Sequence, residues 1–432
     1  MDSRRNVAMT TPPWGAGERP GPSASAGPQS PRDAPRVPER INPLVLGTFC
    51  LMVMSFYFEL PNRSFAWEVP TMTAAVFLLS ALLAPWTSFG RVPGTLPWLA
   101  GFLLAYLVSA TIHPWSSVNE FFHFFVLLVQ ALLVFWASFN LLSHEQAAIT
   151  VLWWFGIAGL VRAALPMIGV GRTAYTVWTG GERVSAFGQN ANFSAFLMSL
   201  GLVTLIGLTY GRRGRPLWMR LLVLPLAAVF GVGIVETGSR GGLLALVGGL
   251  AAFLFSPGER LQARIRNAAA TLLAIGVLGY TALHTDVMRN RLEATAETGT
   301  LAGREQLFPS LVDMFLEKPA LGWGPINYQY EVAVRGTDLA RYSRDAHNLL
   351  LELLTAGGLV ATVPFLIAFA WCGIAAWRGR ATPLGMVSFA LFAVCLVANL
   401  STNLIAYKPF YFVLALAAAS SHRARESQTC AG

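Results

Sequence analysis

The chain has 432 residues, of which 54% are hydrophobic and only 12% are charged, and its mean hydropathy is +0.53. A soluble domain carries about 25% charged residues, so this composition excludes an ordinary soluble protein and predicts an all-α membrane protein. The net charge of +9 lies mostly in short loops between apolar runs, where basic residues set membrane orientation. We therefore expect membrane lipids as partners and no nucleic acid.

The first 40 residues differ in composition from the rest of the chain. They are rich in Pro, Gly, Ser and Arg and show no apolar period. Such a segment cannot bury enough apolar surface to offset its chain entropy, and it lacks the apolar centre of a signal peptide. We expect a disordered cytoplasmic tail at 1–40, a transmembrane domain at 41–420 and a cytoplasmic C-terminal tail at 421–432.

From residue 41 onward, apolar runs approach the roughly 20 residues that a membrane-spanning helix needs. They predict a polytopic protein with about twelve transmembrane helices. The runs lie near 43–60, 70–85, 96–112, 119–142, 147–168, 191–210, 217–235, 241–255, 267–284, 347–371, 383–398 and 404–420.

The distribution of basic residues among the loops predicts how these helices are oriented in the membrane. With the N-terminus inside, the loops after most even-numbered helices carry arginines, such as the cluster from Arg212 to Arg220, as the positive-inside rule requires. The other loops then lie outside, and the one at 284–346 is far longer than an ordinary connection. Its apolar residues Leu307, Leu311 and Met314 predict a helix within this loop. Long ordered loops usually serve function.

Three arginines in the outer loops, Arg183, Arg240 and Arg304, lie beside glycine or serine. Cationic charge outside runs against the orientation rule, and guanidinium groups beside flexible backbone suit bidentate binding of phosphate oxygens. Ser239 and Arg240 also precede a helix expected to start at Gly241, whose N–H groups favour anions. The alternative is that each arginine pairs with a local carboxylate or reaches lipid head groups.

A histidine lies at the membrane end of the long loop, in the run from Arg344 to Asn348. His347 is expected to open the helix that follows, with Asp345 available as its N-cap. A histidine that is neutral near pH 7 can take a proton from a hydroxyl. A structural role at the helix start is the alternative, but the neighbouring Arg344 and Asn348 favour the role of a base.

The sequence motifs of several well-known enzyme classes are absent. The sequence has no P-loop, no H-E-x-x-H zinc motif and no G-x-S-x-G nucleophile within a strand pattern. Its outer loops contain no Asp-x-Asp and no adjacent acidic pair, whereas a divalent metal wants clustered oxygen ligands. We therefore expect no metal and no cofactor. Arg162 and Lys408 are the main candidates for charges inside the membrane, which a transporter would need.

Four short motifs follow one another between Arg183 and Gly358. They are R-V-S-A-F-G-Q-N-A-N at 183–192, S-R-G-G at 239–242, G-R at 303–304 with K-P-A-L-G-W-G-P at 318–325, and H-N-L-L-L-E at 347–352 ahead of G-G-L at 357–359. In this order they resemble the O-antigen ligase and polymerase superfamily. One departure is Gln189-Asn190, where the family pattern leads us to expect an Asn-Pro-like turn before Asn192.

The resemblance implies a GT-C-like protein of the bacterial inner membrane with cytoplasmic termini and a periplasmic active site. It implies transfer of O-antigen glycan from undecaprenyl pyrophosphate to a sugar of lipid A-core. It also suggests His347 as the catalytic base and Arg240 as an essential catalytic arginine. The expected substrate-binding residues are Arg183, Asn192, Ser239, Arg304, Arg344 and Asn348.

The expected mechanism is a single, metal-independent displacement. Arginines would stabilise the departing pyrophosphate, and His347 would deprotonate the acceptor hydroxyl, an effect of about 10²–10⁴-fold. An opening between helices would admit the polyprenyl tail. A glycan polymerase or a protein O-oligosaccharyltransferase of the same superfamily would share every motif, and a membrane transporter is the alternative from another class.

Overall fold

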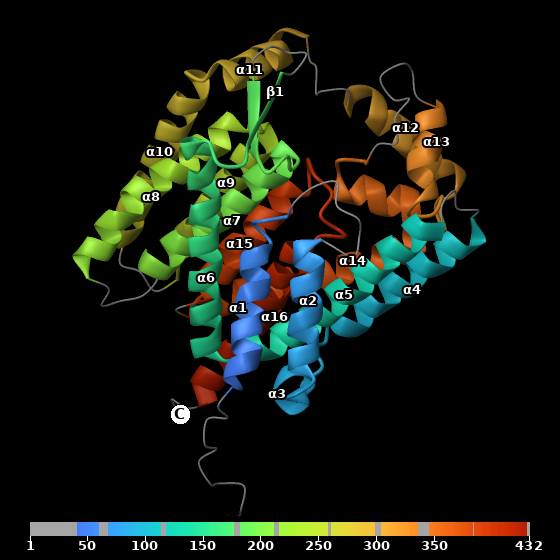
Figure 1. Cartoon of the computed structure of the whole chain (residues 1–432), viewed down its shortest axis with the longest axis horizontal. Coiled ribbons are helices and arrows are strands. Elements are labelled where there is room, and N and C mark those ends of the chain that lie inside the picture. The colour runs from blue at the N-terminus through green and yellow to red at the C-terminus, as the bar shows by residue number, and fades with distance from the viewer. Residues whose placement is uncertain are drawn as a thin grey trace, which may run out of the picture. The chain divides into compact units, whose positions relative to one another are not determined.

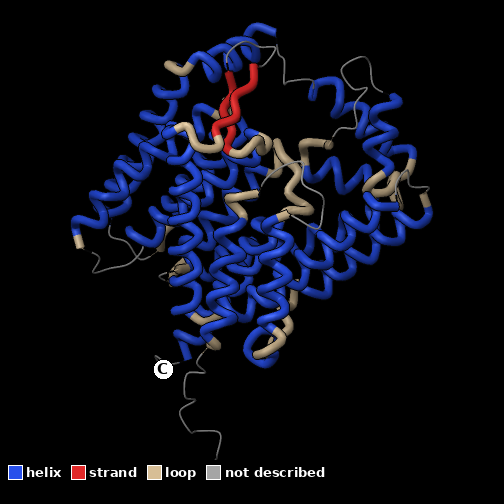
Figure 2. Tube along the Cα trace, in the orientation of Figure 1, coloured by secondary structure: helices blue, strands red, loops and turns tan. Residues whose placement is uncertain are grey.

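The computed structural model describes residues 41–59, 68–113, 118–176, 182–210, 216–257, 261–298, 304–335, 345–382 and 384–429. These residues are almost entirely helical, apart from one two-stranded hairpin (Figure 1 and Figure 2). The expected tail at 1–40 and Arg344 lie outside the described residues.

Each of the twelve apolar runs contains a helix. These helices are α1 (Pro43–Ser55), α2 (Val69–Ala81), α4 (Leu96–Ile112), α5 (Val118–Leu142), α6 (Glu145–Ala164), α7 (Ala191–Tyr210), α8 (Leu217–Glu236), α9 (Arg240–Ala252), α10 (Leu261–Leu283), α14 (Leu349–Gly379), α15 (Gly385–Ala398) and α16 (Lys408–Thr429). The expectation of an all-α polytopic membrane protein is confirmed.

The helices differ in whether their length suits a membrane crossing. Five in the described part of the chain are long and apolar enough, namely α5, α6 with the short 3-10 helix η3 (Leu165–Ile168), α7, α8 and α14. A sixth is added if α10 and α11 (Asp286–Thr298), bent by 90°, form one span. The helices α1, α2, α4, α9 and α15 are apolar but shorter. The number of helices that cross the membrane therefore stays a prediction.

The remaining elements lie in the connections. The short helix α3 (Pro85–Phe89) follows α2, and η4 (Phe253–Phe255) follows α9. The long loop contains α11, α12 (Arg304–Glu317) and α13 (Asn327–Arg335), so the helix expected from Leu307, Leu311 and Met314 is present. The strands β1 (Arg172–Thr176) and β2 (Glu182–Ala186) pair antiparallel.

The hairpin and the helices of the long loop gather at one end of the helical bundle. Figure 1 shows β1, α11, α12 and α13 there, with α3 and the C-terminal end of the chain at the opposite end. The end that carries β1 and β2 is called the hairpin end below. Helix α7 passes through the centre of the bundle, since 89% of its apolar window is buried against 28% for α8, as expected for a helix that is hydrophobic all round.

Helix α14 is bent at Gly358, where the segment that follows α12 docks against it. Gly358 has a left-handed φ of 60°, and a Cβ there would lie 2.3 Å from a backbone oxygen of the docked segment. The Leu359 N–H donates to the Pro319 carbonyl at 2.8 Å, and the Trp323 N–H donates to the Thr355 carbonyl at 2.8 Å. The motif at 318–325 therefore contacts the end of the motif at 347–359, and hydrogen bonds between the two satisfy backbone groups of both.

Candidate active site

Strand β2 carries Arg183 to the turn that precedes α9. Arg183 is buried; its Nε donates to the Thr237 carbonyl at 2.7 Å and its Nη2 donates to Asn192 Oδ1 at 3.1 Å. Asn190 Oδ1 accepts a hydrogen bond from the Asn192 N–H at 2.8 Å, the geometry of an N-cap. The Gln189-Asn190 departure thus supplies the cap of α7 in place of a proline turn, and it leaves Asn192 in contact with Arg183.

The start of α9 lies one residue earlier than the Gly241 that the sequence predicts. Ser239 is its N-cap, and the buried Oγ accepts a hydrogen bond from the Gly242 N–H at 3.0 Å. Arg240 is the first helical residue. Ser239 therefore has a structural role, while its expected contact with substrate stays a prediction.

Arg291 on α11 also lies in this region and is not among the residues predicted from the sequence. Arg240 Nη1 donates to the Arg291 carbonyl at 3.3 Å. Gly238, with φ of 62°, comes so close that a Cβ would lie 3.5 Å from side-chain carbons of both Arg183 and Arg291. Only glycine adopts this conformation readily. Nothing in the sequence distinguishes Arg291 from the other charged residues of α11.

Arg304 lies at the start of α12 and contacts the connection 399–407, called the α15–α16 loop below. Its Nη2 donates to the Ser401 carbonyl at 2.8 Å. The same loop touches the start of α9, because a Cβ on Gly241 would lie 1.9 Å from Ser401 Oγ. Burial lowers the pKa of Arg304, and the charges of Arg240 and Arg183 lower it further. The three predicted arginines are thus within electrostatic range of one another, and such a cluster favours a bound polyanion.

His347 lies just before α14 in an unusual backbone conformation. Its φ is 50°, a left-handed value that is uncommon for a residue other than glycine and is often found at functional sites. The helix starts at Leu349, and its N-cap is Asn348, whose Oδ1 accepts a hydrogen bond from the Leu351 N–H at 3.1 Å. The helix thus starts at Leu349, two residues after His347, as the sequence predicts, whereas the expectation that Asp345 caps it is wrong.

The α15–α16 loop connects His347 with the arginine cluster. Asn348 Nδ2 donates to the Leu400 carbonyl at 3.3 Å, and the Leu349 N–H donates to the Asn399 carbonyl at 3.0 Å. Arg304 binds the next carbonyl of the same loop. The α15–α16 loop thus contacts the starts of three helices that are remote in the sequence, α9, α12 and α14.

Asp345 instead belongs to a second polar cluster beside His347. Its Oδ1 accepts a hydrogen bond from Asn403 Nδ2 at 3.2 Å and a longer one from the Tyr328 hydroxyl at 3.4 Å. The Glu352 side chain, only 2% exposed, lies against it. Burial, with the charges of Glu352 and Asp345, raises the pKa of Tyr328 well above its usual value, so this hydroxyl stays protonated.

Asp345 and Glu352, called the acid pair below, could not be recognised as a pair in the sequence, where the acidic residues are scattered. A weak signal existed, since Glu352 is an ionisable residue within an apolar run, which commonly marks a functional position. Within the described residues no group of three His, Cys, Asp or Glu side chains is arranged to hold a metal ion. That the protein needs no metal stays a prediction.

The two charges expected inside the membrane are both buried. Arg162 Nη2 donates to Gln189 Oε1 at 2.7 Å, and Lys408 Nζ donates to Thr71 Oγ1 at 2.9 Å. Glu59 lies close enough to Arg162 and to Lys408 to interact electrostatically with both. These side chains therefore belong to a polar network between helix ends.

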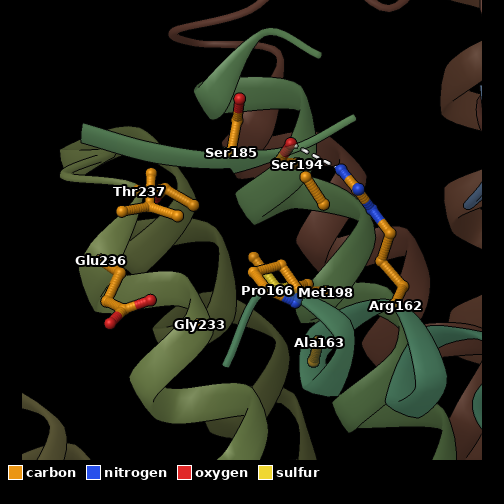
Figure 3. Close-up of a pocket in the computed structure, with 11 residues that line it drawn as sticks. Arg162, Ala163, Pro166, Ser185, Ser194, Met198, Gly233, Glu236 and Thr237 are labelled. Atoms are coloured by element: carbon orange, nitrogen blue, oxygen red, sulfur yellow. Dashed lines mark hydrogen bonds between the residues drawn. The ribbon is translucent and has the colours of Figure 1, made fainter. Parts of the chain in front are cut away.

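A small pocket lies next to Arg162, toward the turn before α9 (Figure 3). Its lining includes Arg162, Ser185, Ser194, Glu236 and Thr237. Figure 3 shows the Arg162 guanidinium directed to Ser194, whose Oγ accepts its hydrogen bond at 2.7 Å. The pocket has a volume of about 10 Å³, which is room for a single water molecule. It is too small for a sugar or a phosphate.

Comparisons with known proteins bear on this site. Residues 225–366 match the sequence model of the O-antigen ligase family, a stretch that contains Arg240, Arg304 and His347. The chain is also 26% identical over 271 residues to an O-antigen ligase of Pseudomonas aeruginosa. That match covers 63% of this chain and 62% of the relative, so it spans less than two thirds of the relative's length.

Proposed function

We propose that this chain, which belongs to the O-antigen ligase superfamily, transfers O-antigen glycan from undecaprenyl pyrophosphate to a sugar of lipid A-core. The hairpin end would face the periplasm, and the reaction would occur there at the surface of the bacterial inner membrane. The transfer would need neither a metal nor another cofactor. The superfamily is supported by the family match at 225–366 and by the similarity to the Pseudomonas ligase.

The observation that carries this proposal is the convergence of three arginines from separate elements. The charges of Arg183 on β2 and Arg240 on α9 both act on Arg304 on α12. A pyrophosphate carries the clustered negative charge that such a group binds best, and guanidinium planes match phosphate oxygens bidentately. In the transition state, charge builds up on the departing pyrophosphate, so arginines fixed beforehand would lower the barrier.

His347 would act as the catalytic base. The two residues that follow it, Asn348 and Leu349, and the side chain of Arg304 donate to neighbouring carbonyls of the α15–α16 loop, which supports a common site for base and leaving group. The imidazole would take the proton of an acceptor hydroxyl as that oxygen bonds to the anomeric carbon. The bond from the anomeric carbon to the pyrophosphate oxygen would break in the same step, and the anomeric centre would invert.

An apolar groove between α4 and α14 supports a lipid-borne substrate. It is lined by Pro97, Gly101 and Val108 of α4 and by Val360 and Pro364 of α14, among others, and has a volume of about 490 Å³. Val360 lies two residues after the bend of α14, on the helix whose start follows His347. A hydrocarbon chain lying in this groove would reach the site from within the bilayer.

The test is reconstitution of the purified chain in liposomes with undecaprenyl-pyrophosphate-linked glycan and one of two acceptors. With lipid A-core, glycan should appear on the core, and Arg240→Ala should abolish that product. With donor alone, no lengthening of the lipid-linked glycan should occur. Lengthened donor without modified core would instead identify a polymerase and refute the proposed acceptor.

A further inference from the structure

Two carboxyl groups meet beside His347. Asp345 precedes the histidine by two residues, and Glu352 projects from the first turns of α14 behind it. The Glu352 carboxyl lies close enough to Asp345, Tyr328 and Asn403 to interact with each of them. Along the chain, the turn that contains His347 therefore lies between two acids whose side chains interact.

The described groups that act on Glu352 include no cation. Tyr328 comes from α13, Tyr106 from α4, and Tyr407 and Asn403 from the α15–α16 loop, and each interacts with one or both acids. Arg344 lies outside the described residues.

One oxygen of the pair has no donor. Glu352 Oε2 is buried and has no hydrogen-bond partner among the described residues. A buried polar atom left in this state costs about 1–3 kcal/mol, and more when it is charged. Two ionised carboxylates are both acceptors and repel each other. A single proton removes both problems, because it turns one carboxyl into a donor to the other.

We propose that Asp345 and Glu352 share one proton, and that this acid pair is a positioning device that holds His347 in its left-handed turn. Asn403 extends the contact to the α15–α16 loop, to which Asn348 and Arg304 are also bound. The pair thus fixes the base relative to the arginine cluster. This role rests on the proposed function of His347, whereas the shared proton does not.

Infrared difference spectroscopy of the purified protein tests the shared proton without any substrate. At neutral pH the wild type should show the carbonyl stretch of a protonated buried carboxyl. Glu352→Gln and Asp345→Asn should each remove that band, while Glu120→Gln, at an exposed position of α5, should leave it. A wild-type spectrum without this band, or a band that both variants retain, overturns the proposal and would indicate that Arg344 or another cation neutralises two ionised acids.

Transfer kinetics test the positioning role. Glu352→Gln keeps a donor toward Asp345, so its kcat at neutral pH should stay within about threefold of wild type. Glu352→Ala removes the contact and should lower kcat by up to about 10²-fold, the effect expected of a misplaced base, with little change in KM. The wild type should lose activity at alkaline pH as the shared proton leaves, and Glu352→Gln should not.

A Gln variant as inactive as the Ala variant would contradict the positioning role. If instead no variant or wild type transfers glycan while the infrared band behaves as expected, the proposed function fails and the shared proton stands.

Discussion

At the scale of single residues, each predicted arginine anchors a backbone oxygen. Arg183 holds the Thr237 carbonyl and Arg304 holds the Ser401 carbonyl. A guanidinium has five N–H donors, so anchoring the backbone and binding a phosphate are compatible roles. Structural pairing and anion binding are therefore not alternatives for these arginines, because the contact with a backbone oxygen fixes the guanidinium that would bind the phosphate.

Arg240→Ala should lower kcat/KM for glycan transfer by roughly 10²-fold or more, because one fixed donor to a developing anion is lost. Arg240→Lys should restore only part of the activity, since a point charge cannot replace a planar fork. The matched control is Arg289→Ala on the same side of the protein, an exposed arginine paired with Asp286. Normal donor binding and turnover by Arg240→Ala would reduce this residue to a structural contact.

Arg304 gives a prediction about pH. Burial and the neighbouring arginines lower its pKa, but a guanidinium stays protonated through the physiological range. In Arg304→Lys the same environment acts on an amine whose ordinary pKa is about 10.4. The lysine should therefore lose its charge at a lower pH than an ordinary lysine, and the KM for donor should increase at alkaline pH in the variant but not in the wild type. Parallel KM profiles would show that residue 304 does not meet the donor's charge.

At the scale of elements, the apolar runs were sufficient to predict helices, including α12 from Leu307, Leu311 and Met314, all of which are buried. The hairpin was missed because 169–190 is glycine-rich and polar. A signal was present there, since Thr and Tyr residues at 172–176 precede a Gly-Gly pair at 180–181, a pattern typical of a hairpin.

The acid pair and Arg291 could not be predicted in the same way. Asp345 meets Glu352 because the backbone turns at His347, and that turn is held by contacts to α13 and to the α15–α16 loop. Arg291 reaches the site because Gly238 allows close approach. Both features depend on tertiary packing rather than on local pattern, whereas the arginine and histidine motifs were visible as short runs.

The bend of α14 is expected to be essential to the fold. Gly358→Ala would place a Cβ 2.3 Å from the Ala320 carbonyl oxygen and would hold alanine at a positive φ, a strain of about 1–3 kcal/mol before the clash is counted. Thermal unfolding in detergent should therefore shift to a clearly lower temperature. Gly276→Ala on α10, where a Cβ meets nothing within 4 Å, is the control and should leave the unfolding temperature unchanged or raise it. Equal behaviour of the two variants would argue against the docked segment.

At the scale of the whole molecule, the gathering of β1, α11, α12 and α13 at the hairpin end (Figure 1) is what the charge-based orientation requires of outer segments. The prediction is tested by single cysteines in a cysteine-free background. Cysteines at positions 179 and 336 should react with an impermeant reagent in intact cells, and those at 211 and 257 should react only after permeabilisation. Protection of position 336 in intact cells would place the long loop inside and remove the basis of the proposed site.

The central claim is that a histidine and arginines, without a divalent metal, perform glycan transfer at the hairpin end. The most direct test measures transfer by purified wild type and His347 variants in excess EDTA. Wild-type activity should persist and should rise with pH between about 6 and 7, where an ordinary histidine loses its proton. His347→Ala should insert and fold yet transfer nothing measurable, and His347→Gln should bind donor without turnover. Activity that EDTA abolishes and magnesium restores, or substantial turnover by His347→Ala, would contradict the account.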